Sequence, residues 1–386
     1  MKITDVKAYV VMPDIPGMSD RERQWTFVQI ETDEGITGWG EATNYPGGGS
    51  LLSAHTIRLL RDILIGEDAA EIERLWHKMY RQYTYLGVRG LPTTAISGID
   101  IALWDIKGKA CGRPIYDLLG GKLYANVRLY ANGWFVGCQT PEQYAAAAQR
   151  VVAAGHTAIK LDPFLEMIPY HTAYLTGQIS ADGEELGCNI VSAIRAAVGP
   201  KIEILIDAHG HYNVPTAVRL ANRLYTESKI EWFEEPVPPE GVDALRAVRE
   251  QTQCRICVGE RLFTRWDFLP ILQQRLADYL MPDVVWTGGI SELKKIATLA
   301  ETYFIPTSPH NAMGPLQVIA GAHVMLTVPN FYRQEYNVAA IPAYNSVLTA
   351  PINFQGGTVN VSGKPGLGVE LDLDYLKGHL YPGWVM

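Results

Sequence analysis

The chain of 386 residues is too long for one small core, and one large barrel with an added layer would account for its length. Hydrophobic residues make up 47% of it and charged residues 19%, without long blocks of one charge, which excludes extended disorder. The formal net charge of -8, with no stripe rich in Lys and Arg, argues against a nucleic-acid partner, so an anionic substrate would need a metal or a few placed cations.

The first segment, "MKITDVKAYVVMPDIPG", has neither the charge pattern nor the length of a signal peptide, and no apolar run approaches a membrane span. The five cysteines are few for the length and odd in number, which suits a reducing compartment. We therefore predict a cytoplasmic protein with no membrane partner. Cys254 and Cys257 form a C-x-x-C, but their flank "QCRICVGE" is typical of a strand, which favours packing over zinc or redox chemistry.

Residues 1–125 are predicted to form an α+β unit. "DVKAYVV" and "WTFVQIETDEGITGWGEA" alternate as strands do, with "DEG" as a hairpin turn. From Leu51 to Tyr80 the apolar residues recur at helical spacing, and "PTTAISGIDIALWDIKGKACG" carries a further apolar stripe that ends near Gly112.

Residues 126–345 change to short apolar runs separated by helical stretches. Alternating strands and helices imply a parallel sheet, and eight strands fit a closed (β/α) barrel better than an open sheet. The runs are "VRLYANG", "TAIKLDP", "IEILIDAHG", "IEWFEEP", "RICVGE", "DYLMPD", "YFIPTSPH" and "FYRQEYN".

Polar residues recur at the carboxyl ends of six successive runs, 23 to 27 residues apart, which is close to one βα unit. In a barrel, these strand ends form the face on which active sites are built. The residues are Asp207, Glu234, Glu260, Asp283, His310 and Glu335.

Three of these residues, Asp207, Glu234 and Glu260, are carboxylates on neighbouring strands. Left unpaired, they would repel one another and raise each other's pKa, so a hard divalent cation is the natural compensation. Mg²⁺ fits best, because it prefers oxygen ligands and a site that leaves several of its coordination positions open. The alternative is that each acid pairs with a lysine or caps a helix. In "FEEP", strand alternation sends Glu234 and Glu235 to opposite faces, so only one of them can be a ligand. The position in the series favours Glu234 as that ligand.

His310, in "SPHNAMGP", follows the strand after the one that ends at Asp283. A carboxylate on an adjacent strand can hold one imidazole nitrogen, fix its tautomer and prepare the ring as a general base. The histidines outside residues 205–212 and 310 are expected to be ordinary core or surface side chains. They are His55, His77, His156, His171, His323 and His379.

The run "LIDAHGHY", residues 205–212, adds two histidines to an aspartate. Strand alternation would point Asp207 and His209 the same way, with His211 beyond the strand end in the loop. His209 and His211 could form a zinc pair, but three hard carboxylates nearby favour magnesium and leave His209 as an acid.

Six further motifs are "GIDIALWDIKGK", "WFEEPV", "VGERLFTRWDF", "PDVVWTGGISELKKIATLA", "SPHNAMGP" and "KPGLGVELD". On these motifs the chain resembles the enolase superfamily, mandelate racemase subgroup, over essentially its whole length. Within that subgroup it resembles the galactonate dehydratase-like acid-sugar dehydratases.

The resemblance implies an α/β fold: a modified (β/α)7β TIM-like barrel, with an N-terminal α+β capping domain that residues 346–386 return to complete. It implies that Asp207, Glu234 and Glu260 bind Mg²⁺, and that the protein forms a homo-oligomer. It also implies a catalytic pair and a substrate ligand, which are Asp283 with His310, and Glu335.

This assignment agrees with the chemistry of such substrates. A proton beside a carboxylate is too weakly acidic for an unaided side chain, so the ene-diolate needs the metal and donors placed in advance. A protonated Glu335 would add one such donor.

One departure from the subgroup bears on the reaction type. Its racemases end the second barrel strand in K-x-K, where the last lysine is a second base, whereas "AIKLDPF" has Lys160 followed by Asp162. Asp162 is too weak a base for this proton, so His310 is the one competent base and racemisation is not expected. His209 would then protonate the departing 3-OH while His310 removes the C2 proton.

The predicted reaction is dehydration of an aldonate, such as D-galactonate or D-gluconate, to a 2-keto-3-deoxy acid, with R configuration at C2 implied by the resemblance. We expect Lys160, Asp162 and Glu335 to contact this small sugar acid. Epimerisation or lactone cycloisomerisation through the same enolate is the alternative, and a non-catalytic sugar-acid-binding protein is a third possibility.

The segments "DIPGMSDRERQ" and "NYPGGGS" are expected to close over the distal hydroxyls, as is "YTYLGVRG", in which Arg89 is a ligand or a structural residue.

Overall fold

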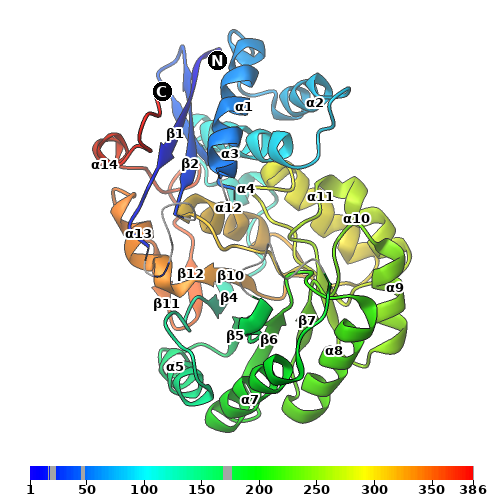
Figure 1. Cartoon of the computed structure of the whole chain (residues 1–386). Helices are drawn as coiled ribbons and strands as arrows, with labels where there is room; N and C mark the ends of the chain where they lie inside the picture. The colour runs from blue at the N-terminus through cyan, green and yellow to red at the C-terminus, as the bar shows by residue number, and fades with distance from the viewer. Residues whose placement is uncertain (16, 18–22, 45–47, 168–175, 386) are drawn as a thin grey trace.

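The computed structural model describes residues 1–385 except 16, 18–22, 45–47 and 168–175. A three-stranded sheet with its helices forms a cap that packs on a larger α/β barrel (Figure 1). The described ends of the chain both lie in the cap, because the C-terminal segment returns to the first strand (Figure 1). The predicted fold class, a modified (β/α)7β barrel with an α+β cap, is confirmed.

The cap sheet pairs β1 (Ile3–Val11), β2 (Trp25–Thr32) and β3 (Thr37–Glu41) antiparallel, in that order. Residues 33–35 turn between β2 and β3 as "DEG" predicts, and Gly35 takes a positive φ of 75° there. The helical stretch from Leu51 to Tyr80 is divided into α1 (Gly49–Leu64) and α2 (Ile72–Gln82).

Helix α3 (Leu91–Cys111) lies directly on β3. The two backbones meet at glycines, since a Cβ at Gly40 would lie 1.9 Å from the carbonyl oxygen of Gly98. The helix ends at Gly112, whose φ of 64° is left-handed, as the sequence predicts. The short α4 (Ile115–Leu118) then leads to the barrel.

The barrel closes because its last strand pairs parallel with its first. Neighbouring strands pair in chain order, so their carboxyl ends meet at one rim. The strands are β4 (Val127–Asn132), β5 (Ala158–Leu161), β6 (Glu203–Asp207), β7 (Trp232–Glu234), β8 (Ile256–Val258), β9 (Tyr279–Leu280) and β10 (Gln334–Asn337). The described helices between them are α5 (Pro141–Ala153), α7 (Ala181–Val198), α8 (Val214–Ser228), α9 (Val242–Gln251), α10 (Thr264–Gln273), α11 (Gly289–Thr302) and α12 (Pro315–Met325).

The run "YFIPTSPH", predicted as a strand, is the least regular part of the barrel. Its Thr307 forms single parallel bridges to Leu280 of β9 and to Phe331, and these bridges carry the sheet round to β10. Pro306 and Pro309 flank this position, and a proline has no N–H to donate, so the ladder does not extend.

Buried carboxylates of α3 hold the cap to the rest of the molecule. Asp100 accepts hydrogen bonds from the backbone N–H and the hydroxyl of Ser291, at 3.1 and 2.6 Å, at the start of α11. Asp105 accepts from the backbone N–H groups of Trp39 and Leu367 at 2.9 and 2.8 Å. These bonds join the cap sheet, the barrel and the C-terminal segment through one helix.

After the barrel, α13 (Ile341–Ser346) is followed by the hairpin of β11 (Asn353–Gln355) and β12 (Thr358–Asn360), which pairs with the amino end of β4. The segment after α14 (Leu373–Gly378) then reaches β1. The backbone N–H of Tyr381 donates to the carbonyl of Val10 at 2.8 Å. The indole N–H of Trp384 donates to the carbonyl of Ala8 at 2.9 Å.

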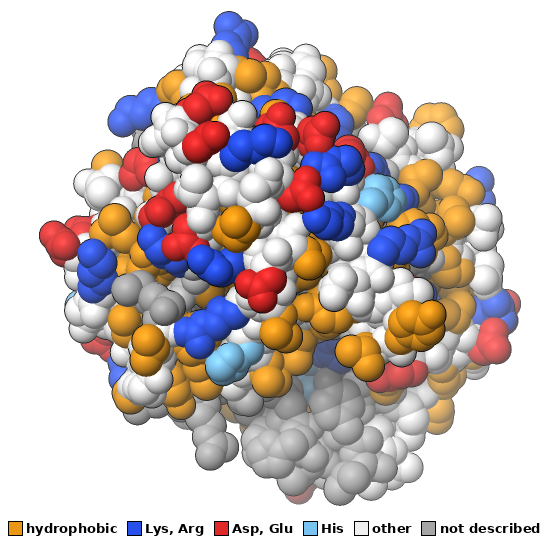
Figure 2. All heavy atoms as spheres, turned by 90° about the horizontal axis from the view of Figure 1, so that it is seen from above, with side chains coloured by type: hydrophobic (Ala, Val, Ile, Leu, Met, Phe, Trp, Pro, Cys, Tyr) orange, Lys and Arg blue, Asp and Glu red, His pale blue; other side chains and the backbone are white. Residues whose placement is uncertain are grey.

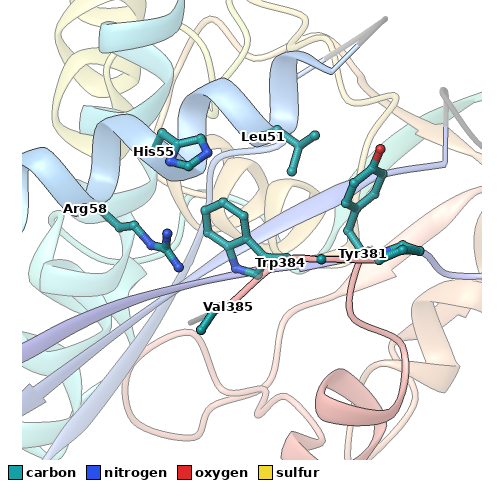
Figure 3. A pocket seen from close by; sticks show the side chains of 8 residues that line it. Leu51, His55, Arg58, Tyr381, Trp384 and Val385 are labelled. Carbon is teal, nitrogen blue, oxygen red and sulfur yellow. The ribbon is translucent and has the colours of Figure 1, made fainter.

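Trp384 also lies against α1 (Figure 3). The guanidinium of Arg58 is 4.1 Å from the centre of the indole, and His55 meets the ring nearly edge-on at 5.0 Å. These side chains line a pocket of about 230 Å³, to which no predicted site residue contributes.

The face seen in Figure 2 carries basic and acidic side chains interspersed with one another and with apolar ones. Within the described ranges, no helix combines the length and the apolar composition needed to cross a membrane.

Candidate active site

Three carboxylates converge where the barrel strands end. Asp207 and Glu234 are the last residues of β6 and β7, and they are paired across these strands. Glu260 follows β8 by two residues. One ligand oxygen of each lies within 4.8 Å of the others, and all three side chains are buried. The structure thus brings together the three predicted ligands, named here the acidic triad.

One buried ammonium shares this space. Lys160 projects from β5, and its Nζ lies 2.6 Å from Glu234 and 3.0 Å from Asp207. It also lies 2.9 Å from Glu335. Burial opposes the charge, but these carboxylates outweigh it and hold the pKa of Lys160 well above its usual range.

Lys160, together with the Arg261 guanidinium 3.3 Å from Glu260, does not offset the burial of all three acids. Burial and the neighbouring Asp207 carboxylate hold the pKa of Glu234 well above its usual range, so one of the three acids favours its neutral form. Only carboxylate oxygens are offered, and they lie close enough together for one ion to reach. This donor set fits a hard divalent metal ion, which would let all three acids ionise.

His310 and Asp283 form a second group at the rim, named here the dyad. Nδ1 of His310 donates to Oδ2 of Asp283 at 2.6 Å, which leaves Nε2 on the side of the acidic triad, 3.5 Å from Glu260. Asp283 stands three residues beyond β9, and its Oδ1 accepts from the backbone N–H of Val285 at 2.7 Å.

The carboxylates around His310 control its charge. Burial opposes protonation, but the neighbouring acids outweigh it and raise the pKa of His310 to about 9. Those acids are Glu335, Glu260 and Asp283. Neutralising the acidic triad would therefore favour the neutral imidazole, which is the form that can accept a proton.

A second imidazole, that of His209, lies at the other end of the acidic triad. Its Nδ1 donates to Oδ2 of Asp162 at 2.9 Å, and its Nε2 is 3.4 Å from Oδ2 of Asp207. The sequence predicted this convergence, but the reason given for it, strand alternation, is wrong. Strand β6 ends at Asp207, and His209 reaches the site through a turn with a left-handed φ of 48°.

Asp162 supports His209, a pairing that the sequence did not reveal. One oxygen of Asp162 accepts from His209 and the other from the backbone N–H of Phe164 at 2.9 Å. Burial disfavours the imidazolium, but Asp207 and Asp162 raise the pKa of His209 above its ordinary value. This ring is therefore stabilised as an acid.

His211 lies beyond the strand end, as expected, but it is buried. Its ring stacks on that of His209 with the centroids 5.6 Å apart. Burial, with the charges of His209 and Arg261, lowers the pKa of His211 to about 3. A neutral His211 adds no positive charge beside His209.

Glu335 lies within β10 and faces the same centre. Its carboxylate accepts from Asn132 at 2.7 Å and from the hydroxyl of Tyr130 at 3.2 Å, besides its contact with Lys160. Burial opposes ionisation, but Lys160 and His310 hold the pKa of Glu335 below its usual range. The protonated Glu335 considered from the sequence is therefore disfavoured, and the donor at this point is Lys160.

The segments expected to close over a substrate are described only in part. Residues 16 and 18–22 of "DIPGMSDRERQ" and 45–47 of "NYPGGGS" lie outside the described residues. In the third segment, "YTYLGVRG", the guanidinium of Arg89 pairs with Asp267 at 2.7 Å. Arg89 thus has a structural partner on α10.

Gln317 is a site residue that the sequence analysis missed. Its Nε2 donates to Oδ2 of Asp283 at 2.6 Å, and its Oε1 accepts from the backbone N–H of Met313 at 2.7 Å. In α12, "PLQVIAGAHVM", all side chains are buried and only Gln317 and His323 are polar. A polar residue in such an apolar helix was the available signal.

Two family models match most of the chain. The Enolase C-terminal domain-like model matches residues 143–375, and the N-terminal domain of mandelate racemase / muconate lactonizing enzyme matches residues 7–120.

Among curated proteins, a D-gluconate dehydratase of Thermoproteus tenax is 34% identical over 89% of this chain and 67% of its own length. A D-xylonate dehydratase of Haloferax volcanii is 33% identical over 99% and 90%. A D-galactonate dehydratase of Ralstonia pickettii is 35% identical over 96% and 92%.

Solved structures agree with this fold. A mandelate racemase/muconate lactonizing enzyme-like protein from Rubrobacter xylanophilus has a TM-score of 0.88 and 35% identity, covering 99% of this chain and 98% of its own. A member of the enolase superfamily from Salmonella Typhimurium has a TM-score of 0.90 and 31% identity, covering 98% of each chain. The chain belongs to the mandelate racemase / muconate lactonizing enzyme family of the enolase superfamily, as its motifs indicated.

Proposed function

We propose that the protein is a metal-dependent hydro-lyase that dehydrates an aldonate, such as D-galactonate or D-gluconate, to a 2-keto-3-deoxy acid. The observation that carries this proposal is the placement of two imidazoles at opposite ends of the acidic triad. His310 lies beside Glu260 and His209 beside Asp207. A base and an acid facing one bound substrate are what β-elimination of water needs.

The acidic triad would hold the metal, for which Mg²⁺ is the best fit to three carboxylates. The bound ion would supply positive charge to the substrate carboxylate as negative charge builds up on it during proton removal. Lys160 would donate to the same carboxylate, because its ammonium already lies among the acidic triad and Glu335.

His310 would remove the C2 proton through Nε2, while Asp283 holds Nδ1 and stabilises the imidazolium that forms. His209 would give its Nε2 proton to the 3-OH, which leaves as water while the C2–C3 double bond forms. The resulting enol then tautomerises to the 2-keto acid. Asp162 would keep the ring of His209 in the orientation for this transfer.

The substrate class follows from the relatives. Their names specify D-gluconate, D-xylonate and D-galactonate, which are all aldonates. Each of these acids has one carboxylate, whereas an aldarate has a carboxylate at both ends. Aldonates are therefore favoured over aldarates.

The first experiment is a screen of the purified protein with Mg²⁺ against hexonates, pentonates and aldarates, reading formation of 2-keto-3-deoxy acid. An aldonate hit that EDTA abolishes would support both the reaction and the metal. The expected inactive variant is His310→Asn, since it removes the base.

The alternative, epimerisation or cycloisomerisation, predicts a different pattern. The protein would then exchange the C2 proton with deuterium from D₂O, or invert it, without forming the keto acid. That result would overturn the dehydratase proposal but keep the shared proton-abstraction step. A cytoplasmic location and homo-oligomeric assembly stay predictions, and a light-scattering mass equal to one chain would contradict the assembly.

A further inference from the structure

The dyad is held by a side chain that no part of the proposed reaction uses. Oδ2 of Asp283 accepts two hydrogen bonds of 2.6 Å, one from His310 and one from Nε2 of Gln317. Asp283 and Gln317 are fully buried, so solvent cannot replace this donor. The Oε1 atom of Gln317 is itself held by the backbone of Met313, which fixes which end of the amide faces Asp283.

The backbone that carries Gln317 is anchored by the cap. Glu41, the last residue of β3, accepts from the N–H of Gly314 at 2.7 Å and from the N–H of Gln317 at 3.0 Å. These are N–H groups at the start of α12, which have no partner within the helix. A carboxylate distant in sequence thus caps the helix that presents Gln317 to the dyad. Figure 1 shows α12 between the cap and the barrel strands.

The fit between Glu41 and α12 is close. A Cβ at Gly314 would lie 2.5 Å from Oε1 of Glu41, so this approach requires glycine. Burial raises the pKa of Glu41 to about 7, although the hydrogen bonds from Thr43, Gln317 and Gly314 act to lower it. A costly buried acid is therefore kept where it fixes the start of α12.

A second contact runs from the same strand end to the other member of the dyad. The indole N–H of Trp286 donates to the carbonyl of Thr43 at 2.9 Å. The ring of Trp286 lies against the imidazole of His310, with the centroids 5.1 Å apart and the planes inclined by 32°. Residues 41–43 of the cap therefore support Asp283 through Gln317, and His310 through Trp286.

We propose that Gln317 is a positioning residue for the dyad and that Glu41 transmits the placement of the cap to it. This inference rests on the proposed role of His310 as the base. It assigns to the cap, besides any contact with substrate, the task of setting the geometry of proton removal in the barrel. Misplacing a reacting group by about 1 Å can slow a reaction by roughly 100-fold.

The first test compares Gln317→Met with Gln334→Met, using the aldonate that the wild type turns over fastest. Gln334 is also buried, and its amide donates to the carbonyl of Val318 in the same helix at 2.8 Å, without contact to the dyad. We expect Gln317→Met to lower kcat by about 10- to 100-fold with KM unchanged. Gln334→Met should keep kcat within threefold of the wild type.

The second test compares Glu41→Gln with Asp100→Asn. Both residues are buried acids of the cap that accept backbone N–H groups at the start of a barrel helix, α12 and α11 respectively. If these acids only hold the cap in place, the two variants will lose thermal stability alike and keep kcat. We expect Glu41→Gln alone to lower kcat, in the same direction as Gln317→Met and by a smaller factor.

A primary isotope effect separates misplacement from loss of folded protein. A smaller folded fraction lowers kcat without changing the isotope effect for a C2-deuterated substrate, whereas a misplaced base slows the proton-transfer step itself. We expect the isotope effect on kcat to be at least as large in Gln317→Met as in the wild type. We expect the melting temperature of Gln317→Met to equal that of Gln334→Met. Equal kcat values for these two variants would overturn the inference. If His310→Asn keeps wild-type kcat, the proposed function fails instead, and the inference falls with it.

Discussion

His209 and His310 have matching surroundings, and they differ in which carboxylate of the acidic triad they approach. His310 has its own carboxylate partner and lies beside Glu260, whereas His209 is paired with Asp162 and lies beside Asp207. The two rings approach the acidic triad from opposite ends. Substitution of His209 alone should therefore separate proton removal from loss of the hydroxyl, because His310 carries out the first step.

His209→Asn should abolish dehydration while leaving exchange at C2. General acid catalysis contributes roughly 100- to 10,000-fold, so we expect keto acid formation to fall by at least about 100-fold. Proton exchange at C2, followed by NMR in D₂O, should stay within about threefold of the wild type, because His310 is intact. His310→Asn is the matched control and should lose both activities. Loss of exchange in His209→Asn would remove the assignment of His209 as the acid.

Asp162→Asn should change the pH dependence of kcat/KM on its alkaline side. His209 must carry a proton to act, so activity is lost as pH rises through its pKa. Asp162 helps to raise that pKa, so replacing the carboxylate by an amide lowers it. The descending limb should move to lower pH, while the ascending limb, set by His310, stays in place. A descending limb that does not move would show that Asp162 leaves the acid unaffected.

The sequence located the site residues better than it described their partnerships. The acids could be placed at the rim from the sequence because they end successive apolar runs spaced by about one βα unit, and this spacing is visible within each stretch of the chain. The contact between Asp162 and His209 joins residues 47 apart in the chain, and that between Gln317 and Asp283 joins residues 34 apart. Such pairings depend on how turns and helices pack, so no spacing rule reveals them.

At the scale of elements, α3 and β3 are in direct backbone contact. Gly38 and Gly40 alternate with larger residues along β3, and their bare backbones let the helix touch the strand. The sequence "TGWGE" was predicted as a strand. Its glycines gave no hint that a helix backbone lies against them.

Gly40→Ala should destabilise the protein because the added methyl would lie 1.9 Å from the carbonyl oxygen of Gly98. Overpacking of this kind costs about 1–3 kcal/mol, and we expect the melting temperature to fall by several degrees in calorimetry. Gly378→Ala is the control, since a Cβ there meets no atom within 4 Å. Equal melting temperatures for the two variants would contradict a close contact between α3 and β3.

Element boundaries were predictable where local chemistry sets them and less so elsewhere. Gly112 ends α3 because it can adopt the left-handed conformation, and the turn at "DEG" follows the same logic. The strand predicted around Thr307 is reduced to single bridges by its flanking prolines. The long helical pattern after Leu51 is divided in two, which its apolar periodicity did not indicate.

At the scale of the whole molecule, the acidic triad links metal binding to stability. A ligand that binds only the folded state stabilises it by about 2.7 kcal/mol at 100 times its Kd. We expect Mg²⁺ to raise the melting temperature by a few degrees, and EDTA to reverse the change. Glu260→Gln removes one ligand and should reduce the shift, with the loss of affinity measured by calorimetric titration. An unchanged shift in this variant would exclude Glu260 as a ligand.

The C-terminal segment pairs with β1, and this affects the order in which the protein can be completed during synthesis. Tyr381, whose N–H donates to the carbonyl of Val10 in β1, is translated roughly tens of seconds after Val10 at ordinary rates of translation. Until then, this edge of β1 remains open to solvent and to other chains. The edge of the cap sheet is therefore covered only after every strand of the barrel has been made.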